Sequence, residues 1–81
     1  MVNPEELEGL IKEAFPDGHV DVTGDGRHFS AVVVSQAFNG KNMIAQHRLV
    51  YAALGDRFDT EAVHALSLKT YTPEQWQALQ Q

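Results

Sequence analysis

One stretch of the sequence decides how the rest of the chain folds: His64-Ala65-Leu66-Ser67-Leu68-Lys69-Thr70-Tyr71-Thr72-Pro73-Glu74-Gln75-Trp76. Its first half is typical of a strand, which we expect to run from Ala62 to Tyr71. Its second half predicts a helix start, because Thr72 can cap the first turn, Pro73 suits the first helical position and Gln75 completes a capping box. His64, near the start of the strand, is better suited to chemistry than to packing.

Four further elements are expected upstream of this stretch. They are a helix capped by Asn3 and ended by Pro16-Asp17-Gly18, a strand His19–Thr23, a turn at Gly24-Asp25-Gly26 leading to a strand Phe29–Ser35, and a helix from Met43 to about Phe58. The strand Phe29–Ser35 is almost continuously apolar, which is typical of a central strand covered on both faces.

Helical periodicity predicts which side chains the helices bury. At 100° per residue the long helix gathers one apolar stripe, made of Met43, Ile44, Val50, Tyr51, Leu54 and Phe58. Leu49 falls on the opposite side. His47 falls inside the stripe, so we expect a core histidine whose polar atoms are hydrogen-bonded. In the last helix, Trp76 and Leu79 are expected to pack onto the body of the domain.

The order of the elements defines the fold class. It reads α-β-β-α-β-α, an α+β arrangement that fills residues 1–81 as a single domain. The helix between the second and third strands makes those strands parallel if they share a sheet, with a right-handed crossover. We therefore expect one mixed three-stranded sheet with its helices mainly on one face.

Composition excludes several classes of function. The chain has 81 residues and no cysteine, so it can form no disulfide and offers no thiolate to a metal or a substrate. Its net charge of −5 has the wrong sign for binding phosphate backbones by charge. No signal peptide or membrane span is apparent, and a cytoplasmic location is expected. No nucleophile stands with a base and an orienting group, so we do not expect an enzyme.

Two of the four histidines are predicted to lie together. His28 begins the second strand and His64 lies near the start of the third, and parallel neighbours start at the same end of a sheet. Neutral imidazole binds zinc, copper and iron. Two histidines are too few for a closed structural metal site, which needs about four ligands. Any metal site here is therefore incomplete, and the alternative is two strand-end histidines beside water. His19, beside Asp17 and Gly18, is expected on the surface.

A nucleic-acid interpretation rests on the architecture alone. The element order resembles the class II form of the KH domain, which clamps RNA through a Gly-x-x-Gly loop. No two glycines of this chain stand three apart, so that clamp is missing.

Several segments, taken in order, resemble the BolA-like protein family. They are Phe29–Ser35, Phe38-Asn39-Gly40-Lys41, His47-Arg48-Leu49-Val50-Tyr51 and the run from His64 to Trp76. The turn Gly24-Asp25-Gly26-Arg27-His28-Phe29 is most similar to the short-loop bacterial branch, the IbaG type.

The resemblance implies a non-catalytic partner of a monothiol glutaredoxin in iron–sulfur trafficking, iron homeostasis or stress response. The two proteins share a [2Fe–2S] cluster, which is held on the partner's side by a cysteine and by glutathione. No cluster is expected in the isolated chain. The BolA-like histidine ligand maps onto His64. The second ligand comes from the loop between the first two strands; Arg27 stands where some members carry cysteine, which leaves His28 as the nearest candidate and His19 as a weaker one. Imidazole in place of thiolate raises a cluster's reduction potential and makes ligation sensitive to pH.

Two other functions remain open at this stage. Some BolA proteins are described as transcriptional regulators, so a nucleic-acid-binding regulator is the rival function. The other is a plain adaptor that binds a protein through the same surface without metal. A homodimer is left open as well.

Overall fold

The computed structural model describes residues 3–25, 27–55 and 65–80. The elements are α1 (Pro4–Ala14), β1 (His19–Gly24), β2 (Phe29–Val34), the 3-10 turn η1 (Gln36–Phe38), α2 (Met43–Leu54), β3 (Leu66–Tyr71) and α4 (Pro73–Leu79). The order α-β-β-α-β-α expected from the sequence is confirmed. Within the described ranges, no helix combines the length and the apolar character that crossing a membrane requires.

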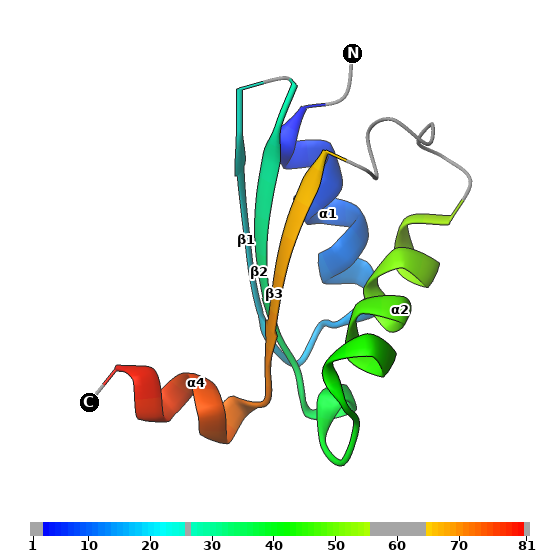
Figure 1. The fold of residues 1–81 in the computed structure, drawn as a ribbon. Coiled ribbons are helices and arrows are strands. Elements are labelled where there is room, and N and C mark those ends of the chain that lie inside the picture. Colours follow the sequence, from blue (N-terminus) through cyan, green and yellow to red (C-terminus); the bar gives the residue numbers. More distant parts are fainter. Residues whose placement is uncertain (1–2, 26, 56–64, 81) are drawn as a thin grey trace.

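The three strands form one mixed sheet in the order β1-β2-β3. β1 and β2 are antiparallel, and β2 and β3 are parallel, as the helical crossover predicts. Helices α1 and α2 lie on one face of this sheet, while α4 extends from its end toward the other side (Figure 1). The prediction that β2 is covered on both faces is wrong, because Ser30 is exposed and Val32 only half-buried on the side away from α1 and α2.

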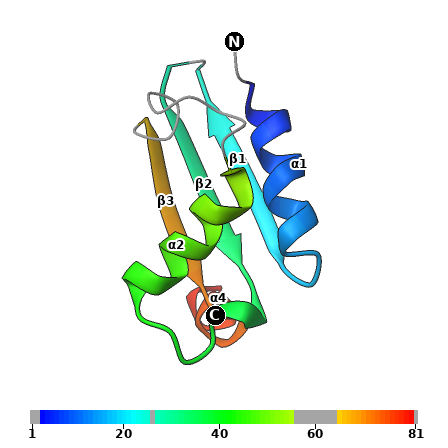
Figure 2. The same cartoon turned by 90° about the vertical axis from the view of Figure 1, so that its right-hand side faces the viewer.

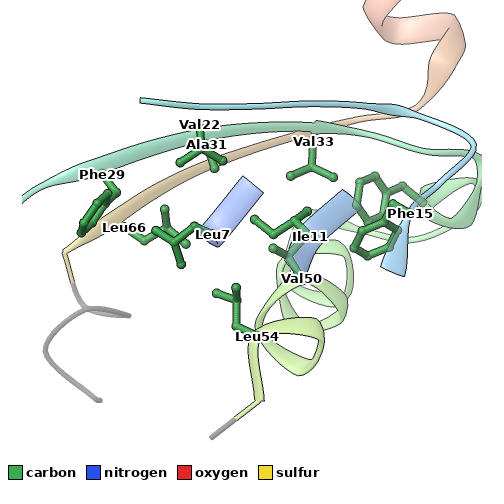
Figure 3. Close-up of a cluster of buried hydrophobic side chains, with 11 residues drawn as sticks. Leu7, Ile11, Phe15, Val22, Phe29, Ala31, Val33, Val50, Leu54 and Leu66 are labelled. Carbon is green, nitrogen blue, oxygen red and sulfur yellow. The ribbon is translucent and has the colours of Figure 1, made fainter. Parts of the chain in front are cut away.

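The hydrophobic core lies between the sheet and these two helices (Figure 3). It contains Leu7, Ile11, Phe15, Val22, Phe29, Ala31, Val33, Phe38, Val50, Leu54 and Leu66. Helix α1, which covers part of this core, begins at a local capping signal. The side chain of Asn3 accepts a hydrogen bond of 2.8 Å from the backbone N–H of Glu6. One face of α1 then buries Leu7 and Ile11, which are one helical turn apart.

Helix α2 buries a different set of residues from the predicted stripe. Val50 and Leu54 are buried, but Met43 and Ile44 are 68% and 64% exposed. The buried line instead begins at Gln46 and repeats every four residues, and Leu49 also packs against the core. The described helix ends at Leu54 with Gly55 as its cap; Phe58, expected in the stripe, lies outside the described residues.

Helix α4 is attached through one aromatic side chain. The capping box predicted at Thr72 and Gln75 is present. The ring of Trp76 stacks on His19 with centroids 5.3 Å apart and meets Tyr71 at 5.6 Å. The prediction that Leu79 packs onto the body is wrong, because this side chain is 62% exposed. A seven-residue helix with no buried residue thus depends on Trp76 for its contact with the sheet.

The buried amide of Gln46 joins three segments of the fold. Its Nε2 donates to the carbonyl oxygens of Lys41 at 2.8 Å and Phe38 at 3.3 Å. Its Oε1 accepts a hydrogen bond of 2.6 Å from the hydroxyl of Thr70 on β3. The side chain is only 7% exposed, so these partners replace water. Gln46 therefore fixes α2 both to the loop before it and to the sheet.

We expect Gln46→Met to lower the free energy of unfolding by about 2–3 kcal/mol, because it leaves buried carbonyl and hydroxyl groups without their partner. Urea denaturation followed by circular dichroism measures the change. Gln77→Met on the exposed surface of α4 is the control and should change stability by less than about 0.5 kcal/mol. Equal stability of the two variants would contradict the structural role of Gln46.

Candidate site at the start of strands β2 and β3

The parallel pairing of β2 with β3 brings two chain segments together. Phe29 pairs with Leu66, so both strands begin at the same end of the sheet. The backbone N–H of Phe29 donates to the carbonyl oxygen of Ala65 at 2.9 Å. His28 immediately precedes Phe29, as the sequence predicts. His64 precedes Ala65 in the chain but lies outside the described residues, as do Ala62 and Val63 of the predicted third strand.

The imidazole of His28 projects from a tight turn into solvent. The turn closes with a hydrogen bond of 3.2 Å from the N–H of Asp25 to the carbonyl oxygen of His28. One carboxylate oxygen of Asp25 also accepts the backbone N–H groups of Arg27 and His28, each at 2.8 Å. The His28 side chain is 80% exposed, with its Nδ1 4.0 Å from the second carboxylate oxygen. The backbone of this histidine is held while its ring stays accessible.

Gly24 is required for this turn because nothing larger fits at its position. A Cβ there would lie 2.5 Å from a ring carbon of Phe29 and 2.8 Å from the carbonyl oxygen of His28. Gly24 is also the residue that pairs with Phe29 across the two strands. The absence of a side chain therefore lets the turn approach the start of β2 and sets the position of His28.

The other two histidines lie elsewhere. His19 begins β1 and pairs with Val34, which is the far end of the sheet from His28. The length of a six-residue strand, about 17 Å, separates the two ends. His19 is exposed and stacks on Trp76, so its predicted surface position is confirmed, and its distance argues against a shared site with His28. His47 is half-buried on α2 rather than part of the core.

The described residues supply too few ligands to hold a metal ion by themselves. No cluster of three or more histidine, aspartate or glutamate side chains occurs within residues 3–25, 27–55 and 65–80. In the described part of the chain, His28 lies 4.0 Å from one other potential ligand, the carboxylate of Asp25. Such an open set can contribute one or two ligands to a centre completed by other groups.

Asp25 has a structural role in this turn that the sequence analysis did not identify. Its carboxylate holds the turn by accepting two backbone N–H groups. An aspartate that opens a glycine-containing turn is a recognised signal for this geometry. The pKa of Asp25 lies below its ordinary value of 3.8, chiefly because the N–H of His28, and next that of Arg27, donate to the carboxylate.

This lowered pKa predicts how the turn responds to acid. Because the carboxylate is favoured in the folded state, its contribution is present at neutral pH and is lost as the pH falls through the lowered pKa. We expect the backbone amide resonances of Arg27 and His28 to shift together below pH 3.8 in an NMR titration. Asp25→Ala should remove this shift and speed hydrogen exchange at both amides. A midpoint at or above 3.8 would contradict the hydrogen bonding described for this turn.

Comparison with known proteins gives consistent matches over nearly the whole chain. The sequence model of the family described as BolA-like protein matches residues 3–75. The acid stress protein IbaG of Escherichia coli K12 is 32% identical over 71 residues, which cover 88% of this chain and 84% of that protein. The DNA-binding transcriptional regulator BolA of the same organism is 33% identical, over 99% of this chain and 85% of that protein. A bolA protein homologue from Coxiella burnetii has a similar structure, with a TM-score of 0.81 and 41% identity over 95% of this chain and 99% of that one.

Proposed function

The chain belongs to the BolA-like family, and we propose that it acts as a non-catalytic partner of a monothiol glutaredoxin, with which it shares a glutathione-ligated [2Fe–2S] cluster. In this role it serves iron–sulfur trafficking or iron and redox signalling. His64 and His28 are the proposed ligands from this chain. The cluster is bound only in the complex.

The observation that supports this proposal most strongly is the alignment of the β2 and β3 starts. The hydrogen bond from Phe29 to Ala65 ties together the two backbone segments that carry the proposed ligands. His28 lies one residue before Phe29, and His64 lies one residue before Ala65 in the sequence. Two paired strand starts are a suitable support for ligands that must meet a partner's thiolates.

The residues at this end of the sheet fit a shared cluster better than a resident metal. An exposed imidazole can reach a group held by another chain, and the chain's lack of cysteine means that every thiolate must come from outside. When bound, a [2Fe–2S] cluster supplies one-electron redox chemistry or transferable iron and sulfide.

Reconstitution of the complex tests the ligand assignment. The chain is mixed with a monothiol glutaredoxin, glutathione, iron and sulfide, and the product is followed by visible circular dichroism. We expect His64→Ala to change the spectrum of the heterocomplex and to speed cluster loss, and His28→Ala to have a smaller effect, because the family resemblance assigns the main ligand to His64.

His19→Phe is the matched control, since it removes an imidazole from the far end of the sheet while keeping an aromatic ring against Trp76. It should leave the spectrum unchanged. If His64→Ala behaves like this control, His64 is not a ligand. A loss in His28→Ala equal to or larger than that in His64→Ala would make His28 a main ligand.

A nucleic-acid-binding regulator is the second candidate, and two observations favour it. The relative named DNA-binding transcriptional regulator BolA is 33% identical to this chain. In addition, the segment from Gly26 to Gly55 contains no aspartate or glutamate but includes Arg27, Lys41 and Arg48. The segment offers cations without carboxylates that would repel phosphate, although Arg27 and Lys41 lie at opposite ends of β2.

Fluorescence anisotropy with duplex DNA at near-physiological salt separates the two functions. We expect weak binding that disappears with a modest increase in salt, because only a few lysine and arginine side chains are available to displace counterions. Arg48→Ala should reduce that weak binding further, whereas Lys12→Ala on α1 should not. Tight, salt-resistant binding to one DNA sequence would favour the regulator.

A further inference from the structure

β3 forms one edge of the sheet. β3 lies at the end of the strand order, and in the described part of the chain β2 is the only strand that pairs with it. The carbonyl oxygens of Ala65 and Tyr71 accept hydrogen bonds from the N–H groups of Phe29 on β2 and of Ser35 just after it. The backbone N–H and C=O groups of successive residues in a strand point alternately toward one neighbour and toward the other. Those of Leu66, Leu68 and Thr70 therefore point away from β2.

This edge has little of the protection that natural sheets use against pairing. Exposed edges are usually shortened, bulged or guarded by proline and charge. β3 pairs with β2 over all six of its residues, contains no proline and carries a single charged side chain, Lys69. The edge can therefore accept another extended strand.

The first turn of α2 lies beside β3 and carries two exposed apolar side chains. The bond between Gln46 and Thr70 places the first turn of α2 next to β3. Figure 2 shows this end of α2 on the β3 side of the sheet. Met43 and Ile44, in that turn, are 68% and 64% exposed, and Leu68 of β3 is only half-buried against the core. These side chains can add apolar contact area to a strand that pairs with this edge.

We infer that two copies of this chain pair through the outer edges of their β3 strands, in antiparallel orientation, to form one continuous six-stranded sheet. A two-fold axis through Leu68 pairs this residue with its own copy and pairs Leu66 with Thr70. Every outward-pointing backbone group of Leu66, Leu68 and Thr70 then faces a complementary one. The first turn of each α2 lies on the same side of the sheet, where it can cover the partner copy's Leu68.

Charge favours this register and this surface. With the axis at Leu68, Lys69 lies opposite Ser67 of the other copy instead of opposite its own equivalent. All eleven acidic residues of the chain fall outside both Gly26–Gly55 and Ala65–Thr72, the segments that contain the proposed contact. Two copies with a net charge of −5 each can approach on this surface without opposing carboxylates.

The contact is small, so the dimer should be weak. One strand edge and one helical turn bury less than the roughly 800 Å² per partner of a standard interface. We expect a monomer at low concentration and a rising share of dimer as the protein approaches about 1 mM. Sedimentation velocity over this concentration range measures the association, and a monomer throughout the range would overturn the inference.

A charged variant of the helical turn tests the apolar part of the contact. Met43→Glu combined with Ile44→Glu should weaken dimerisation about tenfold or more, because it places like charges at the seam. Leu79→Glu is the matched control, since this side chain is 62% exposed and lies on α4. Equal association of the two variants would overturn the role of α2.

Engineered cysteines test the strand register, and the natural chain has no cysteine to interfere. Ser67 of one copy and Lys69 of the other form a non-hydrogen-bonded pair with Cα atoms about 4.5 Å apart, which lies within the span of a disulfide. Mixed Ser67→Cys and Lys69→Cys variants should therefore cross-link efficiently on mild oxidation. Thr23→Cys mixed with Lys69→Cys is the control, because Thr23 is exposed on the same face of the sheet but on β1.

Mass spectrometry of the mixtures gives the yield of each disulfide. A yield for the 67–69 pair at least several-fold above the control supports the antiparallel register centred on Leu68. Equal yields would overturn strand pairing, even if the copies associate through α2. No cluster or glutaredoxin enters these experiments, so their outcome is independent of the proposed function.

Discussion

The parallel pairing of β2 with β3 is the contact on which the rest of this structure depends. It joins Phe29 to Leu66 and Val34 to Tyr71, positions that are far apart in the sequence. α2 must cross one face of the sheet to connect the two strands, which places Val50 and Leu54 over the core. The same pairing decides which loop lies beside the start of β3.

Polar side chains hold both ends of β2. At its start, Asp25 accepts the N–H groups that shape the turn around His28. At its end, Asp17 accepts the hydroxyl of buried Ser35 at 3.1 Å and the N–H of Gln36 at 3.0 Å. The pKa of Asp17 is lowered mainly by that bond from Gln36, in spite of some desolvation. A small domain with few core residues thus uses carboxylates to fix the strand that positions its candidate site.

Much of this fold could be predicted because its signals are local. Asn3 and Thr72 begin helices through hydrogen bonds within one turn, and the glycine-containing turn after β1 leads directly into β2. The errors arise where a distant segment decides burial. Gln46 is buried because carbonyl groups of Phe38 and Lys41 and the hydroxyl of Thr70 are available to it. Periodicity alone therefore assigned Met43 and Ile44 to the core, although both are exposed.

The candidate site was predicted only in part for the same reason. The rule for strand–helix–strand connections placed His28 beside the start of β3, and the structure agrees. His19 lies far from the start of β3 because β1 runs antiparallel to β2 and pairs His19 with Val34 at the end of β2. The position of His19 in the sequence does not by itself reveal this distance. The role of His64 rests on the family resemblance, since this residue lies outside the described part of the chain.

The most direct test of histidine ligation is pulsed EPR of the reduced heterocomplex, prepared with this chain labelled with 15N at histidine. We expect a strongly coupled nitrogen whose hyperfine signal changes on labelling and loses its main component in His64→Ala. A cluster without histidine nitrogen coupling, ligated by thiolates alone, would contradict the shared site at the start of β2 and β3.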